Sequence, residues 1–400
     1  MSGFMRAPAR AVQSAPNRPV ISQLLGITWW NLGWIPVIAA ALLTLLGISA
    51  IATTEPNFAL RQAAYAAVGV IAAALMVVPL PALIERWSPI VFIVTLASLV
   101  LLIAPGVPEA IVRARKGSRC WIDLGPIDIQ PAEFAKVAWI LAGSWWLRRA
   151  ADLKSRTGLL LPIVLTAVPV LLILMQPDLG TALLFFPTLL AMLLAQGARR
   201  MHLGIVVLSA ALLAPASYPI LKPHQRDRID SLIAQLTGDT RYDRGIGFQG
   251  ARARTLVGSG EFFGNGTETA GSLVRFNRLP EEHNDMIFAV VACRWGFVGG
   301  LAVIVLELAV AAGALAIAVL TKNPFGKLAG SGIGAMLGFQ SFVNIGMTMG
   351  ILPITGLTLP FVSFGGSSIV ASWIAMGLLF SIAAREARVS GVMGGSARRG

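Results

Sequence analysis

Five ionisable side chains lie at the junction between a polar segment and the long apolar run that extends from Met286 to about Leu320. They are Arg278, Glu281, Glu282, His283 and Asp285. A carboxylate at the mouth of a membrane helix is costly unless it is solvated or used. The positive end of the helix dipole favours the ionised form of Asp285, and a general base must begin ionised. Asp285 is therefore a candidate catalytic base. One alternative stays open: Asn284 or Asp285 could serve only as the N-cap of the following helix.

A second group of candidates lies in the segment 117–136, which leads from a loop into an apolar run. Glu133 and Lys136 are three residues apart, so they share a face of the predicted helix and can pair within the membrane. This pair could be purely structural. Alternatively, Lys136, or Arg119 in the preceding loop, could contact a phosphate. Trp121 could be an interfacial anchor or a functional side chain.

Asp178 and two arginines are further candidates. Asp178 stands between two apolar runs with almost no loop, where it could cap a helix or help to line a site. Arg226 and Arg228 open the long polar segment 221–284 and could hold a diphosphate bidentately, or could be solvated at the membrane surface. Repeated glycines in this segment would let its backbone approach a ligand. They form no nucleotide-binding fingerprint, because no strand–turn–helix pattern surrounds them.

The segment 340–368 combines apolar residues with strong helix breakers. Pro353, Pro360 and the run from Gly365 through Ser367 to Ser368 interrupt the helical pattern near the predicted outer face. Irregular backbone at membrane depth is tolerated where it lines a cavity or is buried in protein. Because broken helices also mark transporter sites, this feature alone does not separate an enzyme from a transporter.

The composition indicates which elements must position these residues. The chain has 400 residues, of which 56% are hydrophobic and 13% charged, and the mean hydropathy is +0.74. Continuous apolar runs of about 20 residues are typical of membrane-spanning helices. We predict an all-α polytopic membrane protein with ten transmembrane helices and a large extracytoplasmic loop, 221–284, between helices 7 and 8. The predicted spans are at about 35–53, 62–80, 88–105, 131–147, 158–175, 179–196, 203–220, 286–319, 328–350 and 362–383. The run 286–319 is too long for one straight span, so we expect it to tilt or protrude.

The charge distribution predicts the topology. The formal net charge is +13, and the basic residues lie between apolar runs, as expected for topology signals and contact with anionic lipids. They form no single basic stripe with interleaved aromatics, which argues against nucleic-acid binding. Their bias places both termini in the cytoplasm. The outer segment 106–130 breaks this bias, which indicates an anionic ligand on the outer side; its basic residues are Arg113, Arg115, Lys116 and Arg119.

These observations divide the chain into three parts. We expect a cytoplasmic arm and interfacial segment at 1–33, a transmembrane domain at 34–388 and a disordered cytoplasmic tail at 389–400. Cys120 and Cys293 have no partners at metal-ligand spacing, so the sequence predicts no metal site made of protein ligands.

Five motifs, in order from 117 to 368, carry a family resemblance. They read GSRCWIDLGPIDIQPAEFAK, QPDLGTALLF, LKPHQRDRI with GIGFQ, LPEEHNDMIFAVV with WGFVG, and VNIGMTMGILPITGLTLPFVSFGGSS. The chain resembles the SEDS proteins (shape, elongation, division and sporulation), the RodA/FtsW group. Three positions depart from the family pattern: Cys120 separates Arg119 from Trp121, Asn284 replaces a frequent Thr, and Phe364 replaces the usual Tyr. QRDRI and MTMGILPITG favour the RodA branch, whereas LTLP at 357–360 is seen in FtsW-like chains.

The resemblance implies a peptidoglycan glycosyltransferase that polymerises lipid II at the outer face of the bacterial cytoplasmic membrane. Its substrates would be lipid II and undecaprenyl-diphosphate-linked glycan, and its partner a class B penicillin-binding protein. The family's essential aspartate falls on Asp285 and its functional tryptophan on Trp121. We expect further substrate contacts from Arg119, Lys136, Arg226, Arg228, Glu281 and Ser367, with a divalent cation (Mg or Mn) as possible helper and no organic cofactor.

Three alternatives stay open: an FtsW-like septal polymerase, a lipid II flippase, and a scaffold that only docks a penicillin-binding protein. A flippase would need polar residues across the whole bilayer. Few intramembrane residues are polar and ionisable, namely Glu133, Lys136, Arg294 and Glu307, which favours an outer-face enzyme.

Overall fold

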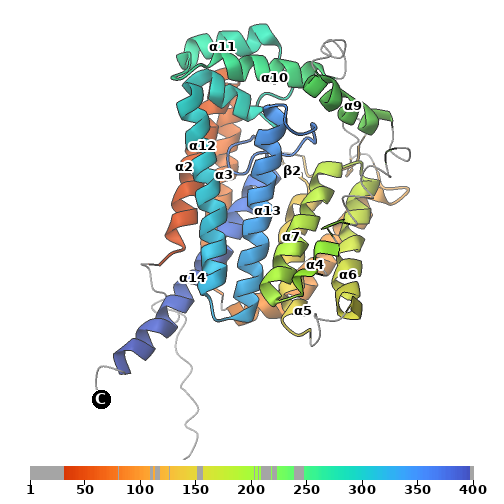
Figure 1. Cartoon of the computed structure of the whole chain (residues 1–400), viewed down its shortest axis with the longest axis vertical. Coiled ribbons are helices and arrows are strands. Elements are labelled where there is room, and N and C mark those ends of the chain that lie inside the picture. Colours follow the sequence, from red (N-terminus) through yellow and green to blue (C-terminus); the bar gives the residue numbers. More distant parts are fainter. Residues whose placement is uncertain are drawn as a thin grey trace, which may run out of the picture.

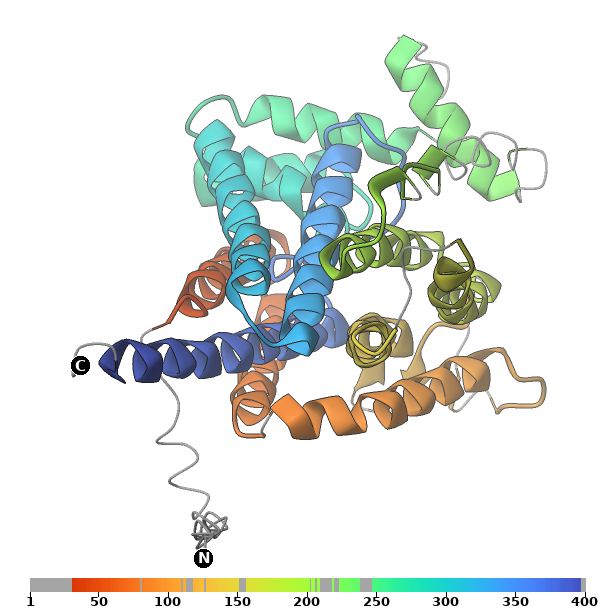
Figure 2. The same cartoon turned by 60° about the horizontal axis from the view of Figure 1, so that its bottom comes forward.

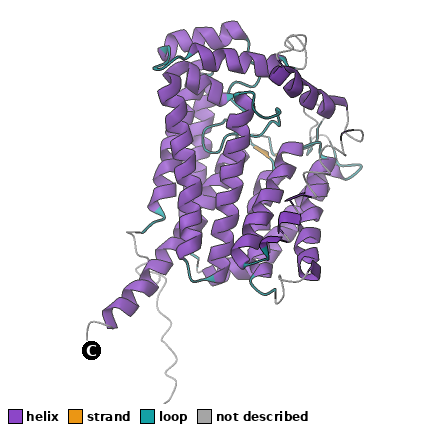
Figure 3. Ribbon diagram, viewed as in Figure 1, coloured by secondary structure: helices purple, strands orange, loops and turns teal. Residues whose placement is uncertain are grey.

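Long helices make up nearly all of the structure, a computed structural model that describes residues 31–396 except 80, 109–110, 113–117, 126, 151–155, 202, 206, 209–217, 219–222 and 238–246. The helices are α2 (Trp34–Thr54), α3 (Pro56–Val77), α4 (Pro81–Ile103), α5 (Pro131–Leu147), α6 (Arg156–Met175), α7 (Leu179–Gln196), α9 (Pro223–Thr237), α10 (Phe248–Ser259), α11 (Gly266–Asn277), α12 (Ile287–Leu320), α13 (Pro324–Thr348) and α14 (Gly366–Ser396). Strands β1 (Ile122–Asp123) and β2 (Asp128–Ile129) pair antiparallel in one small hairpin. The all-α prediction is confirmed (Figures 1 and 3).

Seven of the described helices are long and apolar enough to cross a membrane: α2, α3, α4, α7, α12, α13 and α14. The apolar part of α6, Leu159–Met175, is shorter, and α5 has 17 residues. The predicted span 203–220 falls largely on residues that the structure does not describe. The count of ten spans therefore stays a prediction.

Three helices begin earlier than hydropathy predicted. The spans expected from 62, 88 and 328 start at Pro56, Pro81 and Pro324. Proline suits the first helical turn, because its missing N–H would have no partner there. The first two turns of α3 and α4 also carry polar side chains such as Asn57, Arg61 and Glu85, which lower the local hydropathy before the predicted starts.

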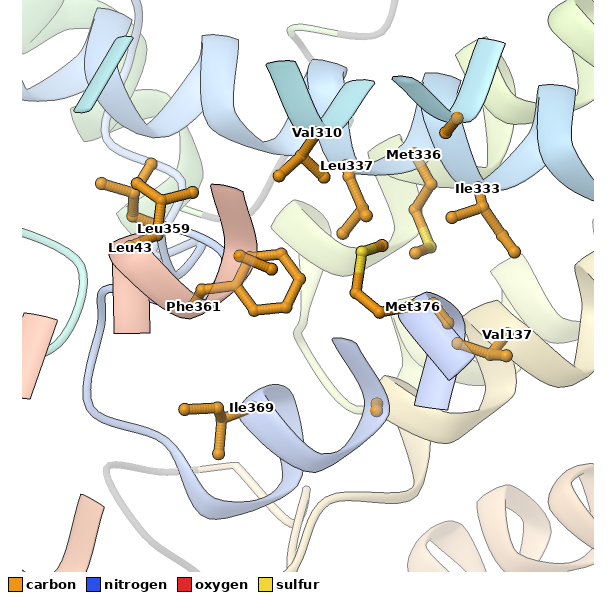
Figure 4. Close-up of a cluster of buried hydrophobic side chains, with 14 of the residues drawn as sticks. Leu43, Val137, Val310, Ile333, Met336, Leu337, Leu359, Phe361, Ile369 and Met376 are labelled. Carbon is orange, nitrogen blue, oxygen red and sulfur yellow. The ribbon is translucent and has the colours of Figure 1, made fainter. Parts of the chain in front are cut away.

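The core joins helices from both halves of the chain. Figure 4 shows side chains from six segments meeting in one apolar cluster: Leu43 of α2, Val137 of α5, Val310 of α12, Met336 and Leu337 of α13, Leu359 and Phe361 of the segment 349–365, and Met376 of α14. Close to this core, α13 contacts α5, α7, α12 and α14. Helix α13 is thus the element against which the site-bearing segments pack.

The long apolar run bends at Gly296. Its backbone is non-helical there (φ 66°, ψ −158°), and the turn between α10 and α11 inserts at the bend. Phe297 N donates to Glu261 O (2.9 Å) and Val298 N to Phe262 O (3.2 Å), so the turn supplies acceptors that the broken helix lacks. Below the bend, residues 297–320 would span roughly 36 Å at about 1.5 Å per residue, enough for one crossing. The length of the run 286–319 is thus divided by a bend, and its predicted tilt or protrusion stays a prediction.

The segment 221–284, which the sequence presented as a polar loop, contains three helices. Helices α10 and α11 lie across the ends of α2, α12 and α13 (Figures 1 and 2). Reciprocal bonds tie them together, since Arg252 Nη1 donates to Asn277 Oδ1 (3.0 Å) and Asn277 Nδ2 donates to Arg252 O (2.8 Å). Their glycines lower helix propensity and their polar composition weakens the apolar periodicity, so neither helix is predicted from the sequence.

The ends of the chain are described only in part. Of the predicted N-terminal arm at 1–33, residues 1–30 lie outside the described residues. At the other end, α14 continues to Ser396, within the segment 389–400 for which disorder was predicted. Residues 397–400 are not described.

Candidate active site

Asp285 lies in a structured turn that links α11 to α12. Helix α11 ends with Arg278 in the left-handed conformation (φ 51°), and Glu281 repeats this conformation (φ 56°). The carbonyl of Glu281 accepts from Asn284 N (3.0 Å) and Met286 N (3.3 Å), and the carbonyl of His283 accepts from Phe364 N (2.8 Å). These bonds fix the backbone that carries Asp285, whose exposed fraction is 7%.

The capping alternative for Asn284 and Asp285 concerns the first turn of α12. The N-cap position of α12 belongs to Met286, and no side chain caps the helix there. Asn284 instead donates from Nδ2 to Glu281 Oε2 (2.5 Å). Asp285 therefore stands one residue before the assigned N-cap, and the capping interpretation is not tested by this geometry.

Three elements surround Asp285. Gln249 of α10 places Nε2 at 3.5 Å from Asp285 Oδ1, and Asn344 of α13 donates from Nδ2 to the Asp285 backbone carbonyl (2.8 Å). Gly356 has φ +78°, and a Cβ built on it would lie 3.9 Å from Asp285 Oδ2. The carboxylate thus lies beside the segment 349–365, with α10 and α13 as its other neighbours.

Lys136 and Glu133 pair as the sequence predicted. Lys136 Nζ lies 3.0 Å from Glu133 Oε2, and both side chains are buried. Lys136 also donates to Gln340 Oε1 (3.1 Å), and Gln340 Nε2 donates to the carbonyl of Thr358 (2.9 Å). The ion pair of α5 is therefore connected through α13 to the same segment that borders Asp285.

Ser367, at the start of α14, holds the β1–β2 hairpin. Its Oγ accepts from Gln130 N (2.9 Å) and donates to Asp128 O (3.4 Å). The next residue, Ser368, shares a hydrogen bond of 3.0 Å with Thr358 Oγ1. Ser367 thus has a docking role beside the polar cluster, and its predicted contact with substrate stays a prediction.

Asp178 caps α7, as one of its two interpretations predicted. It accepts from Thr181 N (3.0 Å) and from Thr181 Oγ1 (2.8 Å), and Gln130 Nε2 lies 3.3 Å from its Oδ2. Burial raises the pKa of Asp178, although the hydrogen bonds from Thr181 oppose this rise. Glu133 and Lys136 also act on its charge, so Asp178 belongs to the same polar cluster as the ion pair.

Cys120, which separates Arg119 from Trp121, is turned inward. Its Sγ donates to the carbonyl of Gln176 (3.1 Å), and burial raises the pKa of the Cys120 thiol to about 11. Arg119 and Trp121 on either side are half-buried. Their predicted contacts with substrate are not tested by this geometry.

The other predicted contacts lie around this cluster or outside the described part. Glu281 is partly exposed in the same turn as Asp285. The guanidinium of Arg226, in α9, lies 5.7 Å from the ring centre of Tyr218, and the side chain of Arg228 is not described. The diphosphate role of the two arginines stays a prediction.

The metal prediction concerns clusters of His, Cys, Asp and Glu side chains. Among the described residues, no group of three or more His, Cys, Asp or Glu is arranged to hold an ion. Mg²⁺ often binds through one or two carboxylates together with substrate phosphates, and the divalent cation stays a prediction.

The sequence did not predict the amide side chains that lie between Asp285 and the Glu133–Lys136 ion pair. Gln249, Gln340 and Asn344 were not selected as site residues. A signal was available for two of them, because Gln340 and Asn344 are four residues apart in an apolar helix and must share one face.

Comparison with known proteins agrees with this arrangement. The family model described as "Cell cycle protein", which covers FtsW, RodA and SpoVE, matches residues 22–388. The chain is 32% identical over 388 residues to "Probable peptidoglycan glycosyltransferase FtsW" of Nitrosococcus halophilus, covering 96% of each chain. It is 33% identical over 324 residues to "Peptidoglycan glycosyltransferase MrdB" of Escherichia coli K12, covering 80% of this chain and 84% of the relative.

A solved structure has the same fold. It is described as "Structural coordination of polymerization and crosslinking by a peptidoglycan synthase complex", and the match has a TM-score of 0.74 and 29% identity over 89% of this chain and 98% of the other. The apolar helices and these relatives together indicate a multi-pass membrane protein. The chain belongs to the FtsW/RodA/SpoVE family of cell cycle proteins.

Proposed function

We propose that this protein is a peptidoglycan glycosyltransferase that polymerises lipid II at the outer face of the bacterial cytoplasmic membrane, with both termini inside. The observation that carries the proposal is the setting of Asp285. Its carboxylate is buried at the junction of α10, α12 and α13, beside Gln249 and the backbone of Gly356. Relatives named as peptidoglycan glycosyltransferases support the same activity.

In the proposed reaction, the 4-hydroxyl of an incoming GlcNAc attacks C1 of a lipid-linked glycan. The new O4–C1 bond forms as the bond from C1 to the diphosphate oxygen breaks, and the electron pair leaves with undecaprenyl diphosphate. Asp285 accepts the hydroxyl proton. Attack from the face opposite the diphosphate inverts the α linkage to β, as in inverting glycosidases. A positioned base contributes about 10²–10⁴-fold to such a step.

Charge that develops on the diphosphate needs positive partners. We assign this role to the arginines of the outer segments, Arg119, Arg226 and Arg228, with a divalent cation entering together with the substrate. Lys136 is already neutralised by Glu133 at 3.0 Å, so its contribution to a phosphate contact requires that pair to open. Trp121 and Glu281 remain proposed substrate contacts.

We further propose a class B penicillin-binding protein as partner, because the structural relative is a peptidoglycan synthase complex. The motifs QRDRI and MTMGILPITG favour a role in cell elongation. A septal role is the second candidate, since relatives named FtsW and MrdB have similar identities of 32% and 33%.

Glycan polymerisation from purified lipid II tests the proposal. Wild type and Asp285→Asn would be assayed alone and with the cognate transpeptidase, with Mg²⁺ or Mn²⁺ present. Asn has nearly the same size but cannot accept the proton. We expect polymer from wild type and none from the folded Asn variant. Equal polymer from both would remove Asp285 as the base, and no polymer from either would favour a flippase or a scaffold.

A further inference from the structure

Helix α13 presents two buried amides on one face. Gln340 and Asn344 are four residues apart, and their exposed fractions are 2% and 0%. Burying an amide is costly unless its polar atoms find partners. The two amides bind the backbone of Asp285, the ammonium of Lys136 and the segment 349–365.

Asn344 connects Asp285 to the segment 349–365. Its Nδ2 donates to the backbone carbonyl of Asp285 (2.8 Å) and to that of Leu357 (2.6 Å). Both amide protons therefore make hydrogen bonds. They determine the orientation of the side chain, since a flipped amide would place Oδ1 against two carbonyl oxygens, which cannot donate. Its Oδ1 is left buried without a hydrogen bond among the described residues. The side chain thus forgoes one hydrogen bond in order to make the other two.

Gln340 makes the equivalent connection for Lys136. Its Oε1 accepts from Lys136 Nζ (3.1 Å) and its Nε2 donates to the carbonyl of Thr358 (2.9 Å). The carbonyls of Leu357 and Thr358 are consecutive. One face of α13 therefore binds two consecutive backbone carbonyls, those of Leu357 and Thr358. On the same face, Asn344 binds the backbone of Asp285 and Gln340 binds the ammonium of Lys136.

We propose that Gln340 and Asn344 are positioning residues, which set the separation between the Asp285 carboxylate and the Lys136 ammonium on the rigid frame of α13. Asn344 acts through Asp285 and Gln340 acts through Lys136. This inference rests on the proposed function, in which Asp285 is the base. Four residues of helix fix the spacing of the two amides at about 6 Å along the axis.

The main competing explanation is that these amides only hold α13 in the bundle. The chain offers a control for it, because Ser341 lies between them and donates to Glu307 Oε2 (2.8 Å), which joins α13 to α12. The other hydrogen bond of Ser341 Oγ goes to the carbonyl of Leu337 in the same helix (2.9 Å), so its described hydrogen bonds do not involve Asp285, Lys136 or the segment 349–365. Ser341→Ala therefore removes a buried contact of the same helix and leaves both charged centres with their partners.

The test compares Asn344→Leu, Gln340→Leu, Ser341→Ala and Asp285→Asn in the full chain with its partner transpeptidase. For each variant, thermal unfolding checks the fold, and initial rates over a range of lipid II concentrations give kcat and KM. Asn344→Asp serves as a second variant of nearly unchanged shape, should the leucine variant fail to fold, because it lacks the two amide N–H donors.

We expect Asn344→Leu to lower kcat by about 10–100-fold with KM changed by less than about threefold, because a misplaced catalytic group costs rate rather than binding. Gln340→Leu should mainly raise KM, and Ser341→Ala should change either constant by less than about threefold. Equal losses of kcat in the Asn344 and Ser341 variants would overturn the inference, as would a wild-type kcat in Asn344→Leu when Asp285→Asn is inactive. Full activity in Asp285→Asn would instead overturn the proposed function.

Discussion

Lys136 Nζ of α5 lies 3.0 Å from Glu133 Oε2, with side-chain exposed fractions of only 4% and 7%. Two opposite charges are thus held away from water and compensate each other. A buried pair of this kind is costly to break, because removing one partner leaves the other charge uncompensated.

We therefore predict that Lys136→Met and Glu133→Leu each destabilise the protein by about 3–5 kcal/mol. The double variant should be more stable than either single variant, since it leaves no unpaired charge. Thermal unfolding in detergent measures this. Single variants as stable as wild type would show that the pair is not formed in the folded protein.

The bend of α12 depends on glycines that let two backbones touch. Gly264 has φ +85°, and a Cβ on it would lie 2.2 Å from Arg294 O. Gly264→Ala should cost at least about 1–3 kcal/mol through backbone strain and overlap, and should lower activity because the turn supports the part of α12 that follows Asp285. Gly258→Ala is the matched control, because a Cβ there meets nothing within 4 Å. It lies in the last turn of α10 and should be neutral or slightly stabilising.

The Cys120 thiol should be unreactive in the folded protein. Burial raises its pKa to about 11, and the thiolate is the reactive form, so only about 10⁻³ to 10⁻⁴ of it is ionised near pH 7.5. Maleimide labelling in a Cys293→Ala background should be slow, and should accelerate with unfolding or as the pH rises toward 11. Rapid labelling of folded protein at pH 7.5 would contradict the buried position.

Asp178 should tolerate asparagine better than alanine. Asn can still accept the bond from Thr181 N, whereas alanine loses the cap at a cost of about 0.5–2 kcal/mol. Because burial raises the folded-state pKa of Asp178, its contribution to stability is largest below the unfolded pKa and declines as the pH rises toward the folded pKa. Unfolding curves of Asp178→Asn should therefore depend less on pH than those of wild type. Identical pH dependence would show that Asp178 does not titrate differently on folding.

The features that depend on local spacing could be predicted from the sequence. Glu133 and Lys136 pair because they are three residues apart on a helix, and Asp178 caps α7 because an aspartate directly before an apolar run can accept from the first turn of the helix. The long-range contacts could not be predicted, since Asn344 reaches Asp285 across 59 residues of chain. The bend at Gly296 could not be predicted either. Its backbone is held by the turn between α10 and α11, and those helices have a weak apolar periodicity.

The measurement that tests the central claim most directly separates binding from chemistry in Asp285→Asn. Lipid II affinity and the rate constant for glycan extension would be measured on the same folded preparation, with its partner. We expect an affinity within about threefold of wild type and a rate constant lower by about 10²–10⁴-fold. A folded variant that binds lipid II normally and extends glycan at the wild-type rate would contradict the assignment of Asp285 as the base.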